Sequence, residues 1–198
     1  MGAHRKGFHV AVIDADRLVA GPEQLPTPRR VVVWLRAHRP SGVAVDSPRR
    51  PAPEGERSRA DERALARAVC GIRYTPDRRA LHANLRYYAW IQHGLELYDA
   101  LAASGWEAIE CFPTATWTRL GGPRRGHPRS GWSRAVLESA GLDGTPTTMN
   151  QDARDAIGAA LTARLHTQGR TERFGDIVVP RGVPARPVVS RVMHEGSA

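Results

Sequence analysis

Three apolar runs along the chain have the pattern of buried β-strands. Residues 8–15 (FHVAVIDA) and 42–46 (GVAVD) are rich in valine and isoleucine, and residues 106–112 (WEAIECF) stop at Pro113. Short apolar runs bounded by polar or turn-forming residues are typical of strands in the interior of a sheet. We therefore predict a strand over each of these ranges.

Helix signals occupy much of the chain between and after these strands. Ser58 is a good N-cap with acidic residues in the following turn, and Gly71 follows the expected end of that helix. Further along, apolar residues recur at helical spacing, which predicts a face that packs on a core rather than a base-stacking surface. Those residues are Tyr87, Ile91, Leu95, Tyr98 and Leu101. We predict helices over residues 58–69, 79–103, 133–140 and 150–166.

Two segments near the N-terminus are harder to assign. The valine triplet within residues 29–40 favours a strand, whereas Thr27 and Pro28 form a good N-cap and first-turn pair for a helix. We favour the helix. Residues 16–28 contain turn signals, among them Gly21–Pro22, and are expected to be irregular.

The alternation of strands and helices predicts an α/β fold. We expect the strands that end near Asp14 and Asp46 to be at least partly parallel. A chain of 198 residues is long enough for one well-cored domain and short for two. We assign residues 1–181 to a single domain and residues 182–198 to a peripheral or flexible C-terminal tail.

Composition narrows the class of protein. The chain is 41% hydrophobic and 25% charged, as in ordinary globular proteins. It has no apolar run near the ~20 residues of a membrane span and no signal-peptide core. Its two cysteines, Cys70 and Cys111, form no CxxC motif, which favours a reducing compartment. We therefore expect a cytoplasmic protein with no membrane partner.

The net charge is strongly positive. The formal charge is +9, and Lys6 is the only lysine, so the excess is carried by arginine. Such an excess favours a polyanionic partner such as DNA or RNA. A generally basic surface without a specific ligand explains the charge equally well. The sequence leaves the oligomeric state open.

Carboxylates gather at the ends of the predicted strands. Asp14, Asp46 and Glu110 lie at or near three such ends, where ligands bind in open α/β sheets. Asp152 and Asp155, three residues apart on a predicted helix, face the same way and are placed to join them. Oxygen ligands without accompanying cysteine or histidine suit Mg²⁺ or Mn²⁺. The pattern as a whole favours a metal site.

Each acid also has a purely structural explanation. Asp46 stands before a Ser-Pro pair and can start a turn. Asp152 and Asp155 are favourable charges at a helix N-terminus, worth ~0.3–1 kcal/mol each. Glu110 can face solvent. Only the coincidence of these positions, and no single acid, favours a site.

Several of these segments resemble one protein family. The chain is similar to the domain of unknown function 429 family, whose members are described as predicted nucleases of the RNase H fold. Residues 150–163 are also similar to the helix of bacterial Holliday-junction resolvases, where a DxxDA pattern places two acids against acids from the sheet. The similar stretches cover most of the chain in the family's order: 12-VID-14, 43-VAVDSP-48, 57-RSRADERAL-65, 70-CGIRYTP-76, 109-IECFPTATW-117 and 150-NQDARDAIGAALTA-163.

The resemblance implies both a fold and an activity. The fold is an RNase H-like mixed sheet flanked by helices, with a shortened N-terminal strand meander, and the small residues of the last helix let it lie close to the sheet. The activity is divalent-metal-dependent hydrolysis of phosphodiester bonds in DNA or RNA. Catalysis falls to Asp14, Asp46 and Asp155, while Glu110 and Asp152 complete the ligands of Mg²⁺ or Mn²⁺. Gln151 departs from the pattern, because related sequences often carry an acid there.

A run of arginines follows the strand that ends at Asp46. Arginine holds phosphate oxygens bidentately, so these residues are candidate phosphate-binding groups, although a solvated helix face explains them too. The candidates are Arg49, Arg50, Arg57, Arg59 and Arg63.

Two other functions stay open. In a non-catalytic module that binds nucleic acid or a protein partner, the arginines matter and the acids do not. A phosphotransferase on a related fold ranks last, because the chain has no glycine-rich phosphate loop.

Overall fold

The strands fall into two separate sheets. In the computed structural model, which describes residues 7–182, β1 (Phe8–Asp14) and β2 (Arg17–Leu25) form an antiparallel hairpin. The other sheet has the strand order β3-β4-β6-β5, with β3, β4 and β6 parallel and β5 antiparallel to β6. An α/β class with a mixed sheet is therefore confirmed. Its strands are β3 (Val43–Val45), β4 (Ala108–Cys111), β5 (Thr171–Phe174) and β6 (Ile177–Pro180).

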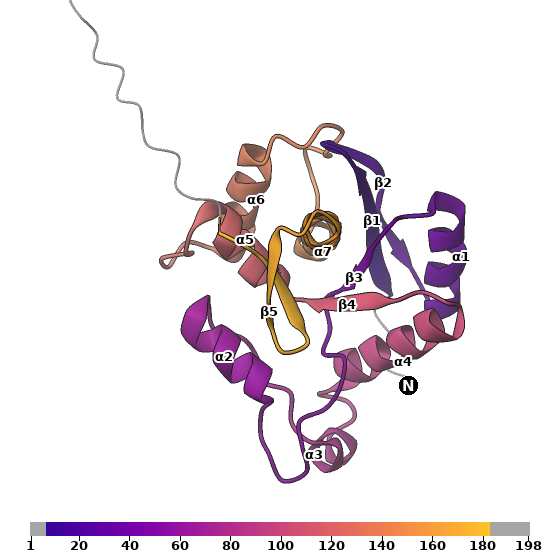
Figure 1. Cartoon of the computed structure of the whole chain (residues 1–198), viewed down its shortest axis with the longest axis vertical. Helices are drawn as coiled ribbons and strands as arrows, with labels where there is room; N and C mark the ends of the chain where they lie inside the picture. Colours follow the sequence, from indigo (N-terminus) through magenta and orange to yellow (C-terminus); the bar gives the residue numbers. More distant parts are fainter. Residues whose placement is uncertain (1–6, 183–198) are drawn as a thin grey trace, which may run out of the picture.

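Helices surround both sheets, and the last of them lies at the centre (Figure 1). That helix, α7, packs against strands of both sheets and against α5 and α6. Within residues 7–182, every helix is too short or too polar to cross a bilayer. The helices are α1 (Pro28–His38), α2 (Ala60–Ala68), α3 (Arg78–Ala83), α4 (Ala89–Ala103), α5 (Pro113–Gly121), α6 (Arg129–Ser139) and α7 (Gln151–Thr167).

Local capping explains where most of the predicted helices begin. Thr27 caps α1 by accepting a hydrogen bond from the backbone N–H of Arg30 at 3.3 Å, so the helical alternative for residues 29–40 is confirmed. Asn150 caps α7 in the same way. Ser58 does not cap α2. The cap there is Arg59, whose backbone N–H donates to Glu62 at 3.0 Å.

Other elements differ from the sequence-based expectation. Residues 16–28 are not irregular, because most of them form β2, an edge strand whose bulge accommodates Gly21 and Pro22. The helix expected over residues 79–103 is two helices, separated by a turn at residues 84–88. Helix α5 and the short hairpin of β5 and β6 were not predicted. The predicted tail lies outside the described residues, apart from residue 182.

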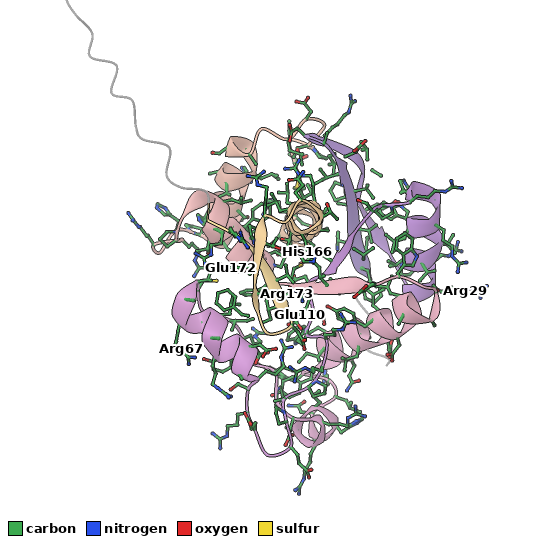
Figure 2. All side chains as sticks on the ribbon, in the orientation of Figure 1. Arg29, Arg67, Glu110, His166, Glu172 and Arg173 are labelled. Atoms are coloured by element: carbon green, nitrogen blue, oxygen red, sulfur yellow. The ribbon has the colours of Figure 1, made fainter. Side chains whose placement is uncertain are left out.

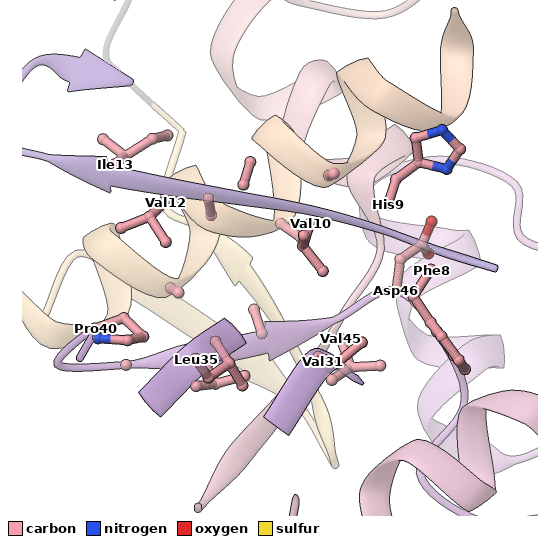
Figure 3. A pocket seen from close by; sticks show the side chains of 18 of the residues that line it. Phe8, His9, Val10, Val12, Ile13, Val31, Leu35, Pro40, Val45 and Asp46 are labelled. Carbon is pink, nitrogen blue, oxygen red and sulfur yellow. The ribbon is translucent and has the colours of Figure 1, made fainter. Parts of the chain in front are cut away.

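Strands β1 and β3 run in opposite directions, so the predicted parallel arrangement is wrong. The contacts of each strand with helix α7 show these directions. Its C-terminal half binds the end of β1, because Arg164 donates to the carbonyl of Ala15, and it also contacts Gly42 at the start of β3. The end of β3 reaches the first turns of α7 instead. Figure 3 shows the same arrangement, with Ile13 and Pro40 towards one end of the view and Phe8 and Asp46 towards the other.

Charged side chains lie both inside and outside this framework. Arg29 and Arg67 are at the periphery, whereas Glu110 on β4 lies in the interior (Figure 2). Burial of a carboxylate is costly unless it is paired and hydrogen-bonded. The position of Glu110 therefore requires a buried cation.

The middle of α7 approaches α5 closely. Gly158 of α7 lies against the indole of Trp117, which is fully buried in the core between α5, α6 and α7. A Cβ added at Gly158 would lie 2.7 Å from Cζ2 of that ring. Glycine is therefore required here by contact and not by backbone conformation.

We expect the substitution Gly158→Ala to destabilise the protein in spite of the better helix propensity of alanine. Overpacking against a buried ring costs roughly 1–3 kcal/mol, which exceeds the gain of at most ~1 kcal/mol from propensity. Gly131→Ala in α6 is the matched control, because no atom lies within 4 Å of its added Cβ. Urea denaturation followed by circular dichroism measures both. Equal stability changes in the two variants would contradict the contact argument.

Candidate functional site

A cavity separates β1 from β3. Its volume is about 1110 Å³, and it is lined by both strands along their length, by α1 and α4, and by α7. The close-up in Figure 3 shows apolar side chains such as Val12, Leu35 and Val45 on its walls. Between Asp155 and Arg164, α7 contributes short side chains to the lining, which lets the helix contact both strands. They include Ala156, Ala159, Ala160 and Ala163.

One end of this cavity is charged. Asp46 follows directly on β3, and Asp152 and Asp155 belong to the first turns of α7. Arg129, the first residue of α6, lines the same end. The C-terminus of a parallel strand and the N-terminus of a helix therefore bring these side chains together, as expected from the acids at strand ends.

Asp46 is the most strongly perturbed acid of this group. Its side chain opens to the cavity, yet protein atoms surround it closely, and burial raises its pKa from 3.8 to about 7. The charges of Asp155, Asp152 and Glu110 raise this pKa further, and Arg129 opposes them. Within residues 7–182, no side chain or backbone group donates a hydrogen bond to the Asp46 carboxylate. This carboxylate is therefore available to an external donor or cation.

Asp155 is in contrast well provided with donors. It is 7% exposed, and its Oδ1 accepts from Trp117 Nε1 at 3.1 Å and from Gln151 Nε2 at 2.9 Å. Its Oδ2 accepts from Arg129 at 2.9 Å. Burial nevertheless raises its pKa, and the charge of Asp152 adds to that effect. Gln151, the first residue of α7, is thus one of the three donors to Asp155.

Glu110 adjoins Asp46 but is held by a buried arginine. Both of its oxygens accept from the guanidinium of Arg59, and Oε2 also accepts from the backbone N–H of Arg49 at 2.8 Å. Burial raises the pKa of Glu110, and Arg59 opposes that shift. The suggestion that Glu110 faces solvent is therefore wrong. Its oxygens are committed to Arg59, so it is a poor candidate for a metal ligand.

Arg59 is not in a position to bind phosphate, the role that the sequence suggested for it. It is 1% exposed and pairs with both Glu62 and Glu110, so the prediction that it binds phosphate is wrong. An arginine at this depth cannot reach a phosphate group at the surface. The arginine-rich pattern did not distinguish this buried member from its neighbours.

The other candidate arginines divide by their partners. Arg49 donates to the carbonyl of Ala108 at 2.8 Å and lies over the ring of Tyr98. Arg57 is exposed and has no partner among residues 7–182. The remaining two form ion pairs at the surface: Arg50 with Asp61 and Asp176, and Arg63 with Glu56.

Asp14 lies at the opposite end of the cavity from Asp46. It ends β1, beside the segment that Arg164 of α7 binds. Nine residues of helix separate Arg164 from Asp155, a rise of roughly 13 Å. The structure therefore does not bring Asp14 to the other acids, because β1 runs in the opposite direction to the expected one.

No preformed metal cage is present in the described part of the chain. Within residues 7–182, no group of three or more histidine, cysteine, aspartate or glutamate side chains is arranged to hold a metal ion. The expected five-carboxylate set of Asp14, Asp46, Glu110, Asp152 and Asp155 is therefore not assembled. Asp46, Asp152 and Asp155 remain together.

Two positively charged residues at the site were not predicted. Arg129 and Arg73 line the cavity beside Asp46. Arg129 belongs to a basic segment of the sequence, but only the contact between α6 and α7 shows that it faces Asp155. Trp117, which donates to Asp155, lies in one of the family-like stretches.

Comparison with known proteins finds no matching family model, no matching curated protein and no matching solved structure. The resemblance to the domain of unknown function 429 family therefore stays a prediction. The geometry of the charged end of the cavity must carry the functional argument.

We expect Arg59→Ala to reduce the free energy of unfolding strongly. Removing the partner of two buried carboxylates leaves uncompensated charge, which costs roughly 3–5 kcal/mol. Arg57→Ala is the neighbouring control, because an exposed side chain without partners contributes within about ±0.5 kcal/mol. Urea denaturation at neutral pH measures both. Similar stability of the two variants would show that the buried pairing is not needed.

We expect Asp46→Asn to stabilise the folded protein at alkaline pH. Because the pKa of Asp46 in the folded state lies above its ordinary value of 3.8, at about 7, folding favours the protonated acid, and stability is lost as the pH rises through this interval. Asparagine stays neutral, so the variant should have the higher melting temperature at about pH 8, with the difference closing towards about pH 5. Thermal unfolding at both pH values measures the effect. A pH-independent difference would contradict the shifted pKa.

Proposed function

We propose that this protein hydrolyses phosphodiester bonds in DNA or RNA with a divalent cation, Mg²⁺ or Mn²⁺, bound at the charged end of the cavity. The observation that carries the proposal is the convergence of Asp46, Asp152 and Asp155. Burial raises the pKa values of Asp46 and Asp155, and the charges of neighbouring acids in the group add to these shifts. Mutual repulsion of this kind is relieved by a cation.

The carboxylates at this end of the cavity fit a Mg²⁺ site with few protein ligands. Mg²⁺ keeps several waters and is commonly held by one or two carboxylates together with phosphate oxygens of the substrate. Asp46 and Asp155 would serve as the carboxylates, with Asp152 close by. A preformed cage of protein ligands is not required for this mode of binding. Asp14 and Glu110 are left out of the ligand set.

The chain's own residues supply the rest of the site. When bound, the cation supplies the charge that neutralises phosphate oxygens and lowers the pKa of a water. Arg129 keeps 41% of its side chain exposed while it pairs with Asp155, so its remaining donors can face a phosphate. Trp117 and Gln151 orient the Asp155 carboxylate. Asp46 opens to the cavity, where a substrate would enter.

The surface next to the site suits a polyanion. Residues 122–128 lead into Arg129 and expose Arg124, Arg125 and His127. A chain with a formal charge of +9 attracts nucleic acid at long range. The acidic site therefore lies beside cationic groups that would hold the backbone of a substrate.

Cleavage of labelled single-stranded DNA, duplex DNA, RNA–DNA hybrid and four-way-junction substrates tests this function. We expect metal-dependent cutting by the wild type, and a loss of roughly 100-fold or more in Asp46→Asn, because an active-site carboxylate that binds the metal is removed. Asp99→Asn, on the exposed face of α4, is the control. Asp14→Asn should also cut normally, because Asp14 lies at the far end of the cavity.

The same panel separates the alternatives. Full metal-dependent activity of Asp46→Asn would refute the proposed site. Inactivity of Asp14→Asn would restore the family arrangement, which needs both acids. Binding that falls steeply with salt, without cleavage in Mg²⁺ or Mn²⁺, would favour the non-catalytic binding module.

A further inference from the structure

An exposed aromatic segment joins α3 to α4. Residues 84–90 (NLRYYAW) comprise a turn at residues 84–88 and the first two residues of α4, and they leave Tyr87 55% and Trp90 38% exposed. Tyr88 packs edge-on against Tyr87, with ring centroids 4.7 Å apart. The sequence-based assignment of Tyr87 to the core is therefore wrong, although Ile91, Tyr98 and Leu101 are buried as predicted.

The physical reason is the turn that separates the two helices. The side chain of Asn84 accepts from the backbone N–H of Tyr87, and α4 begins only at Ala89. Tyr87 therefore does not continue the buried stripe of α4. A group of large exposed apolar side chains in one segment is typical of an interaction surface.

This segment borders the proposed catalytic site. Trp90 and Arg73 line the large cavity together with Asp46, and they also line a smaller pocket that extends to Glu110. The aromatic surface thus begins at the rim of the charged end of the cavity. A chain that passes through the site is within reach of Trp90.

The segment of the chain that carries the rings is rich in arginine. Residues 63–95 contain six arginines and a single acid, Asp77. Asp77 is occupied, because its carboxylate accepts from the backbone N–H groups of Ala80 and Gly55. Arg73 and Arg86 are exposed on either side of the rings in sequence. Charge complementarity therefore selects a polyanionic partner.

We infer that Tyr87 and Trp90, flanked by Arg73 and Arg86, form a stacking surface for unpaired bases of single-stranded nucleic acid. Flat rings in a cationic groove are the means by which proteins bind single strands, because every base offers a π-face. A duplex keeps these faces stacked in its interior. The inference rests on the proposed function for its meaning, since it names the substrate class, but the binding itself requires no catalysis.

Binding measured without metal tests the inference. Fluorescence anisotropy in chelator compares a labelled oligothymidylate, an abasic oligonucleotide of equal length and a duplex. We expect the oligothymidylate to bind most tightly. Tyr87→Ala and Trp90→Ala should each weaken its binding roughly 5- to 150-fold, the range found for stacking aromatics. The abasic probe carries the same phosphates, so its weaker binding should be insensitive to both substitutions.

Matched variants isolate the aromatic ring. Tyr87→Phe keeps the ring and should bind as the wild type does. Leu85→Ala removes an exposed aliphatic side chain from the same segment, 52% exposed, and should also bind normally. Circular dichroism confirms that each variant is folded.

Several results would overturn the inference. Equal binding of the abasic probe and the oligothymidylate would show that only phosphates are recognised. Unchanged affinity in both alanine variants, or tighter binding of the duplex than of the oligothymidylate, would show that the rings do not stack on bases. The rings would then be assigned to a protein partner. The cleavage assay with metal and the binding assay in chelator are read separately for each aromatic variant. Lost cleavage with intact stacking, or the reverse, therefore separates the failure of one proposal from that of the other.

Discussion

The buried guanidinium of Arg59 is the interaction on which the rest of the structure depends. It holds Glu110 of β4 and Glu62 of α2, while Glu110 also accepts from the backbone of Arg49 and Glu62 from the backbone of Thr75. One cation thus ties together the end of β4, the segment after β3, the start of α2 and the segment that precedes α3. Because buried charges must be paired, these four parts of the chain cannot move independently.

The site owes its character to a contrast between two neighbouring carboxylates. Glu110 accepts from both terminal nitrogens of Arg59, whereas Asp46 receives no hydrogen bond within residues 7–182. Burial raises the pKa of both, but only Glu110 has a compensating cation in direct contact. Of the two neighbouring strands, β4 thus carries an acid that a cation neutralises, whereas β3 is followed directly by an acid without such a partner. An uncompensated carboxylate at a cavity is more informative about function than an ion pair, since structural networks rarely leave one.

Sequence patterns within a few residues predicted much of the secondary structure, whereas interactions between distant parts of the chain were not predicted. Strands β1, β3 and β4 and helices α1 and α7 followed from apolar runs and caps, which act over a few residues. Strands β5 and β6 have four residues each and carry too little pattern to be recognised. Apolar pattern also carries no strand direction, so the antiparallel course of β1 was missed, and with it the separation of Asp14 from Asp46. The pairing of Arg59 with Glu110 spans 51 residues, and nothing local marks Arg59 as buried.

The same pairings explain how an acidic site arises in a basic protein. Arg59 neutralises Glu62 and Glu110, and Arg50 neutralises Asp61 and Asp176, so two cations serve four acids. Most of the arginines along residues 63–95 and 122–128 are exposed and make the surface there cationic. Asp46, Asp152 and Asp155 then form a negative pocket within a positive surface. The cationic surface attracts a polyanion at long range, whereas the acids repel it at close contact with the pocket. A bound divalent cation would remove this repulsion. Electrostatics thus makes metal dependence the property that would distinguish the proposed hydrolysis from binding without catalysis.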